Sequence, residues 1–167
     1  MKRLILILVI ALTAGSASFA ASANNESLED IFSEFSEAKN AEYVNVNPFM
    51  MWLGKQFLGS DKDARIVKKI KSVRVLDLED CNSAVKSKFK NRVSNLALNG
   101  YEEMVRTNDN GEKVLVLAKM KKDVIHRMVI VCVSSDDCTL VEVNGKFKMS
   151  DVTGVVNSQT PKHDGRR

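Results

Sequence analysis

The stretch "IHRMVIVCVSSDDCTLVEVNGKF", residues Ile125–Phe147, decides the fold class. Two apolar segments rich in β-branched residues flank the polar segment "SSDDC" (134–138), a pattern typical of two strands joined in a hairpin. Just before them, "YEEMVRT" and "EKVLVLAKM" flank "NDNG" (108–111), a turn sequence that favours another hairpin. Residues 101–147 are therefore predicted to form a meander of four antiparallel strands.

The clearest helix precedes this meander in "SLEDIFSEFSEAKN" (27–40). Its apolar residues recur at i, i+3, i+4 and i+7, which places them on one helical face: Leu28, Ile31, Phe32 and Phe35. Ser27 is a plausible N-terminal cap, because its hydroxyl can accept a hydrogen bond from the first helical turn. A longer helix is predicted over Asp80–Leu98, ending at Asn99-Gly100.

Two strands, "EYVNVN" (42–47) and "IKSVRVLDL" (70–78), are predicted between these helices. Asn47-Pro48 is a helix-start signal, because proline is favoured in the first helical position. The following "FMMWLGKQFL" (49–58) is apolar nearly all round, so this helix is predicted to be deeply packed. A helix between two strands allows a right-handed crossover, and we expect the two strands to pair in parallel.

These elements together predict one α+β domain over residues 24–156. The predicted architecture is a two-layer sandwich, with the helices packed on one face of a mostly antiparallel sheet. Residues 157–167 are polar and aperiodic and are predicted to be a disordered tail.

The N-terminus has the pattern of an export signal. Lys2 and Arg3 precede the apolar run "LILILVIAL" (4–12), and small residues follow, so residues 1–23 are predicted to be a signal peptide. A lipoprotein would offer a cysteine after this run, where the chain has Gly15 and Ser16. We therefore expect a periplasmic or secreted protein that is not lipid-anchored. No later apolar run is long enough for a transmembrane segment after signal cleavage.

Composition and motifs give no sign of catalysis. The chain has 25 basic and 21 acidic residues, and removing Lys2 and Arg3 lowers its formal charge from +4 to +2, a mild value that indicates no particular partner. Motifs for metal binding, phosphate-binding loops and the nucleophile elbow are absent from the sequence. No catalytic, cofactor-binding or metal-binding residue is assigned, and the protein is predicted not to be an enzyme. A small hydrolase of unfamiliar type, centred on His126, is one alternative.

The three cysteines leave several arrangements open. Cys132 and Cys138 lie directly opposite one another if the hairpin loop contains five residues, and could then form a disulfide. If the loop contains four residues, Cys132 faces Thr139 and the two thiols point to opposite faces of the sheet. Cys81 lies on the apolar side of its helix, where a free cysteine behaves as a small hydrophobic residue. A bridge that uses Cys81, or free thiols throughout, are the other arrangements. A thiol-based redox or sensor role for Cys132 and Cys138 is a second alternative.

One apolar segment could bind a partner. Met50, Met51, Trp52 and Phe57 are concentrated in a short stretch, and methionine-rich surfaces adapt to peptide partners. A buried helix is the commoner explanation of such a stretch. The basic runs of the chain lack interleaved aromatic residues, so we expect no nucleic-acid binding.

Several phrases resemble a family of small exported proteins of Bacteroidetes, some with a lipoprotein signal, known as domain of unknown function 4252. They are "SLEDIFSEFSEAKNAEYVNVNPFMM", "IKSVRVLDLED", "YEEMVRTNDNGEKVLVLAK" and "TLVEVNGKFKMSDV". The resemblance covers roughly Leu28 to Val156 and implies one domain in a Gram-negative envelope. It brings no activity, cofactor or site residue.

The sequence therefore predicts a non-catalytic exported envelope protein that binds a protein or another envelope component.

Overall fold

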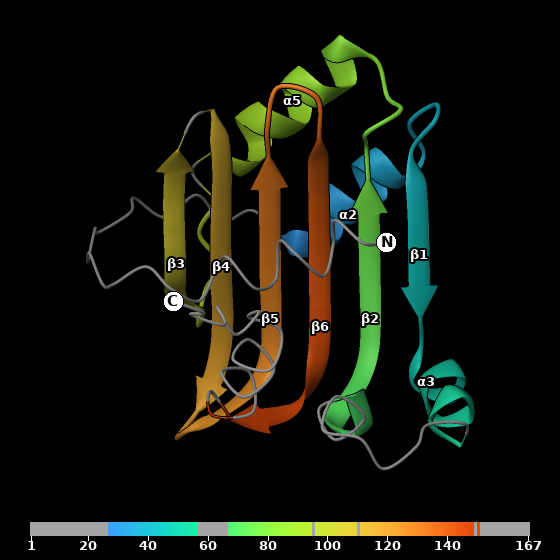
Figure 1. The fold of residues 1–167 in the computed structure, drawn as a ribbon, viewed down its shortest axis with the longest axis vertical. Helices are drawn as coiled ribbons and strands as arrows, with labels where there is room; N and C mark the ends of the chain where they lie inside the picture. The colour runs from blue at the N-terminus through green and yellow to red at the C-terminus, as the bar shows by residue number, and fades with distance from the viewer. Residues whose placement is uncertain (1–26, 57–66, 95, 110, 149, 151–167) are drawn as a thin grey trace, which may run out of the picture.

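A computed structural model describes residues 27–56, 67–94, 96–109, 111–148 and 150. Within these ranges, six strands form one sheet in the order β1-β2-β6-β5-β4-β3, and all neighbours run antiparallel (Figure 1). The antiparallel sheet is as predicted, and the few helices beside it agree with an α+β class. The strands are β1 (Glu42–Val46), β2 (Ile70–Asp77), β3 (Glu102–Asp109), β4 (Glu112–Lys121), β5 (Val124–Val133) and β6 (Cys138–Lys148).

Both predicted hairpins are present. In the turn between β3 and β4, Gly111 has φ +84°, a left-handed conformation that glycine adopts without steric cost. Between β5 and β6, Val133 pairs with Cys138, so the loop consists of residues 134–137. The backbone N–H of Ser134 closes this loop by donating to the carbonyl oxygen of Asp137 at 2.8 Å.

The predicted parallel pairing of the first two strands is wrong. β1 and β2 are antiparallel, with Glu42 opposite Asp77 and Val46 opposite Val73. A parallel pair would need the connecting helix to travel back over the sheet. Helix α3 (Pro48–Lys55) instead lies beyond the end of β1, so β2 starts near the end of the sheet where β1 stops (Figure 1).

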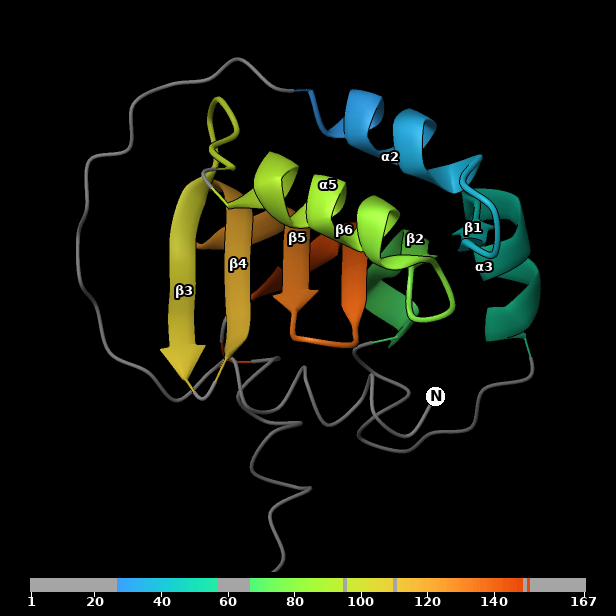
Figure 2. The same ribbon diagram turned by 90° about the horizontal axis from the view of Figure 1, so that it is seen from above.

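Helices α2 (Leu28–Ser36) and α5 (Ser83–Val93) lie side by side over the same side of the sheet (Figure 2). The predicted stripe of α2 is confirmed, because Leu28, Ile31, Phe32 and Phe35 are all buried. Ser27 caps this helix, and its Oγ accepts a hydrogen bond from the backbone N–H of Glu29 at 3.2 Å.

Helix α5 is shorter than the predicted Asp80–Leu98. It starts later because the side chain of Asn82 caps it, accepting a hydrogen bond from the backbone N–H of Val85 at 3.0 Å. Phe89 meets Phe35 of α2 edge to face, with ring centroids 5.2 Å apart. This aromatic pair joins the two helices above the sheet.

The sheet is apolar on both faces. Leu140 and Val129 belong to the cluster that includes α2 and α5, whereas Val141 and Ile130 belong to a second cluster. The division follows from strand geometry, since successive side chains point to opposite faces. Every described member of the second cluster comes from a strand.

Candidate functional site

Helix α3 starts as the sequence predicts. Pro48 occupies the first turn, and the side chain of Asn47 caps the helix. Its Oδ1 accepts hydrogen bonds from the backbone N–H groups of Phe49 and Met50, both at 3.0 Å. Because the cap satisfies two N–H groups that a helix start leaves without partners, this short helix has a defined beginning.

The prediction that this helix is deeply packed is wrong. None of its residues is buried, and Phe49, Met50, Trp52 and Leu53 are 68%, 54%, 57% and 49% exposed. The helix packs against β2 at the end of the sheet and is not enclosed between layers (Figure 1). Of the predicted partner-surface residues, Met50 and Trp52 are exposed and Met51 is half-buried, while Phe57 lies outside the described residues.

Exposed apolar side chains also occur on β1, the strand that precedes α3. The rings of Phe49 and Trp52 are stacked, with centroids 6.0 Å apart. Tyr43 and Val44 are exposed on opposite faces of the sheet, since their β2 partners Leu76 and Val75 belong to the two different clusters. The Tyr43 ring meets Phe32 at a tilt, with ring centroids 5.9 Å apart. We call the six exposed large apolar residues of this part of the chain, on α3 and on both faces of β1, the β1–α3 surface: Tyr43, Val44, Phe49, Met50, Trp52 and Leu53.

Basic residues adjoin the β1–α3 surface. Lys55, at the end of α3, donates from Nζ to the backbone carbonyl oxygen of Lys68 at 2.9 Å and to that of Ile70. These bonds hold α3 to a helical turn at residues 67–69, where Lys68 and Lys69 are exposed, as is Lys71 at the start of β2. In sequence, residues 43–56 and 67–76 contain no aspartate or glutamate.

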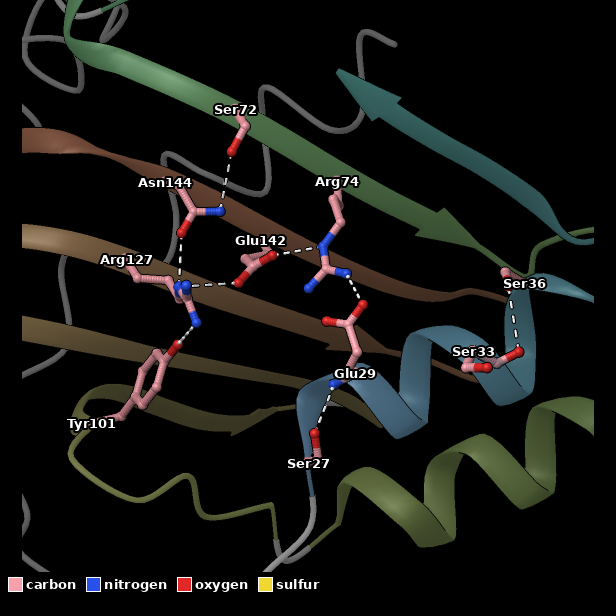
Figure 3. Close-up of polar contacts among 10 residues, drawn as sticks. All are labelled: Ser27, Glu29, Ser33, Ser36, Ser72, Arg74, Tyr101, Arg127, Glu142 and Asn144. Carbon is pink, nitrogen blue, oxygen red and sulfur yellow. Dashed lines mark hydrogen bonds and ion pairs between the residues drawn. The ribbon is translucent and has the colours of Figure 1, made fainter. Parts of the chain in front are cut away.

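A polar network lies on the helix side of the sheet, beyond the apolar cluster (Figure 3). Glu142 is only 2% exposed and lies between two guanidinium groups, 2.7 Å from Nε of Arg74 and 3.3 Å from Nε of Arg127. Arg74 also meets Glu29 of α2 at 2.8 Å, and Arg127 donates to Oδ1 of Asn144 at 2.7 Å. The network therefore joins β2, β6 and β5 to the start of α2.

Electrostatics in this network favour the charged forms. Burial acts to lower the pKa of Arg74, but hydrogen bonds to Glu29 and Glu142 outweigh it and raise that pKa. The hydrogen bond from Arg74 lowers the pKa of Glu29 below its ordinary value. The network was missed in the sequence, although strand alternation places Glu142 on the same face as the buried Leu140. Its carboxylate is already paired, so we interpret its role as structural.

The three cysteines are free. Cys132 pairs with Thr139, the four-residue-loop alternative, and the thiols of Cys132 and Cys138 belong to clusters on opposite faces. A Cys132–Cys138 disulfide is therefore not formed. Burial raises the pKa of Cys132 to about 12, with Asp137 and Glu112 adding to the effect. Burial also raises the pKa of Cys138 and of Cys81, which disfavours the reactive thiolate at neutral pH.

His126 is half-exposed and lies at an irregularity in β5, where the pairing shifts between Ile125 and Arg127. Among the residues that the structure describes, no group of three or more histidine, cysteine or acidic side chains could hold a metal ion.

A cavity of about 910 Å³ opens between α5, the β3–β4 hairpin and the β5–β6 loop. Two of its cations already have partners: Lys90 donates to the carbonyl oxygen of Ser135 at 3.2 Å, and Arg106 pairs with Glu103 at 2.7 Å. Acidic side chains also line it, including Asp136 and Glu112. This mixed lining selects no particular ligand class.

None of the described helices is long and apolar enough to cross a bilayer. Comparisons with curated proteins and with solved structures find no match. The family model for a domain of unknown function, DUF4252, matches residues 35–155, a range that contains α3 and all six strands. The chain therefore belongs to the DUF4252 family.

Proposed function

We propose that this protein is a non-catalytic envelope protein that binds a protein or another envelope component through its β1–α3 surface. The observation that carries the proposal is the exposure of four large apolar side chains on one short helix: Phe49, Met50, Trp52 and Leu53. Contiguous exposed apolar patches on soluble proteins commonly mark interaction sites.

The energetics support a bound state. Burying one large apolar side chain stabilises a state by about 1.5–3 kcal/mol relative to leaving it in water. The four side chains of α3 are 49–68% exposed, so in the isolated chain each of them forgoes a large part of this gain. A partner that covers them would recover it, which makes this surface the favoured place for docking.

The proposal also covers the export of the protein, its location and the arrangement of its layers. Residues 1–23 act as a cleaved signal, and the chain works in the periplasm or outside the cell without a lipid anchor. Helices α2 and α5 form the second layer of a two-layer sandwich, and α3 stands outside that layer, where a partner can reach it. The thiols of Cys132 and Cys138 are free and their pKa values are raised, which favours this binding role over a redox role.

Photo-cross-linking from two positions tests the proposal. A benzophenone amino acid replaces Met50 on α3 or, as a matched control, the exposed Asn108 on β3. In native envelope extract we expect an adduct, protein or lipid by mass, from position 50 and not from position 108. The adduct should disappear when Phe49→Ser and Leu53→Ser are added. Equal adducts from both positions, or none from position 50, would contradict the proposal.

A further inference from the structure

We infer that α3 docks on the surface of an anionic lipid bilayer, with its apolar side chains in the interfacial region. This inference rests on the proposed function and names the class of component that the β1–α3 surface binds. Four observations carry it: the arrangement of the apolar side chains, their chemical types, the adjacent lysines and the small extent of the surface.

The apolar side chains of α3 are arranged for contact with a plane. Phe49, Met50, Trp52 and Leu53 occupy positions i, i+1, i+3 and i+4, which fall within about half the circumference of a helix. All four are half-exposed or more, and the helix lies at the periphery of the molecule (Figure 2). Interfacial helices of this kind bury an apolar face about 5–10 Å into the boundary between headgroups and acyl chains.

Side-chain chemistry agrees with this location. Tryptophan is enriched at membrane–water interfaces, because its ring is apolar while its indole N–H can remain hydrated. Trp52 is the only tryptophan of the chain, and it stands on α3 beside Phe49.

Charge around α3 complements an anionic surface. Lys68, Lys69 and Lys71 are exposed next to the helix, and residues 43–56 and 67–76 carry no acidic side chain. The connecting residues 57–66 contain two aspartates, one lysine and one arginine, so they add no net charge. Lysines close to an anionic membrane each contribute about fivefold to binding.

The extent of the surface favours a bilayer over a second copy of the chain. A stable protein interface typically buries about 800 Å² per partner and involves about 20–30 residues on each side. The β1–α3 surface comprises only six exposed apolar residues. A bilayer needs no shape complementarity, and a few inserted side chains with adjacent lysines suffice for reversible binding.

Trp52 provides a direct test, since its fluorescence reports on α3 alone. The protein is purified after export from the expression host, and its N-terminal residue is determined by mass spectrometry. It is mixed with vesicles of phosphatidylcholine alone or with vesicles in which part of the phosphatidylcholine is replaced by anionic phosphatidylglycerol. We expect a blue shift, quenching by brominated acyl chains and co-sedimentation with the anionic vesicles, all weakened by added salt.

Matched variants locate the binding site. Phe49→Ser with Leu53→Ser should weaken vesicle binding about tenfold or more. Lys71→Ala should weaken it about fivefold, whereas Lys113→Ala, on the exposed start of β4, should leave it unchanged. Thermal unfolding of each variant confirms that the fold is intact.

Two results would overturn the inference. The first is anionic-vesicle binding that does not change in the Phe49 and Leu53 double variant. The second is the absence of a Trp52 shift with anionic vesicles. In that case, a protein adduct from position 50, or a dimer in analytical ultracentrifugation that the double variant disrupts, would leave the proposed function standing with a protein partner. If position 50 also gave no specific adduct, both the bilayer inference and the proposed function would be wrong.

Discussion

β1 and β3 both end the sheet, yet they present different side chains to a neighbouring chain. The middle of β1 is uncharged, with Tyr43, Val44 and Asn45, and its pairing with β2 has no register shift. β3 carries charges along its length and a bulge between Glu103 and Val105. Charges and bulges on edge strands prevent pairing with other chains.

The difference indicates that the β3 edge, and not the β1 edge, is protected from pairing with other chains. The β3 edge carries the two features that discourage strand addition, and Arg106 forms an exposed ion pair with Glu103 there. The β1 edge has no register shift and only one charge, Glu42 at its start, and it is followed directly by α3 with its exposed apolar side chains. We therefore expect association to involve the β1 side of the sheet.

The largest change in unfolding free energy is expected from the polar network around Glu142, which joins β2 to β6 and β5. Glu142→Ala should lower the free energy of unfolding by about 3–5 kcal/mol, because it removes the buried carboxylate that Arg74 and Arg127 share and leaves Arg74 only the exposed Glu29. Arg106→Ala on the β3 edge breaks an exposed pair with Glu103 and should cost at most about 1 kcal/mol. Urea unfolding measures both. Equal costs would contradict a central role for the network.

The second effect concerns Gly145 of β6. A β-carbon there would lie 2.7 Å from the carbonyl oxygen of Lys69 and 3.2 Å from Cα of Ile70. Gly145→Ala should therefore cost about 1–3 kcal/mol of unfolding free energy. Hydrogen exchange should accelerate in β1 and β2 and remain unchanged in β3.

A second glycine is the matched control. Apart from its chain neighbours and the helix's own backbone, no atom lies within 4 Å of the β-carbon position of Gly54 in α3, so Gly54→Ala should stabilise that helix by about 0.5–1 kcal/mol. The steric account of Gly145 would be wrong if both alanine variants had the same stability.

A third test exchanges the characters of the two edges. Val44 is exposed on β1, so Val44→Lys should change the unfolding free energy by no more than about 0.5 kcal/mol. It should also reduce concentration-dependent aggregation, measured by light scattering. Glu103→Val with Arg106→Val on β3 should increase aggregation. If both variants behaved alike, the edges would not differ as we describe.

The smallest effect is a pH dependence at the start of α2. The hydrogen bond from Arg74 lowers the pKa of Glu29 below the ordinary value of 4.5, so the folded state binds this proton more weakly than the unfolded state. The resulting stabilisation is complete above the ordinary pKa and is lost as pH falls through the lowered one. Urea midpoints at neutral and acidic pH should therefore differ less in Glu29→Gln than in the wild type. An unchanged difference would contradict this role.

Local patterns predicted much of the fold. The helix at residues 28–36 could be found because its apolar spacing and its cap at Ser27 lie within one short segment. The hairpins could be found because their turns join adjacent segments. Cys132 and Cys138 could not be placed, because a change of one residue in loop length reverses the face of the sheet.

The candidate site was predicted only in part, because its contacts join residues that are far apart in the sequence. Hydrophobicity marked Met50 and Trp52 but could not tell whether other elements would cover them. Nothing local indicates the direction of β2 relative to β1, because it depends on where α3 lies in space. Glu142 meets Arg74 across 68 positions of the chain, so no short motif contains the pair.

The free cysteines allow local opening of the protein to be measured by thiol alkylation. Cys138 is buried under the helices and Cys132 is half-buried on the opposite face, although the two residues flank one loop. Pulsed alkylation followed by peptide mass analysis would time the opening of each face separately, without introducing a label. The alkylation rate of Cys81, just before α5, would report on the detachment of that helix.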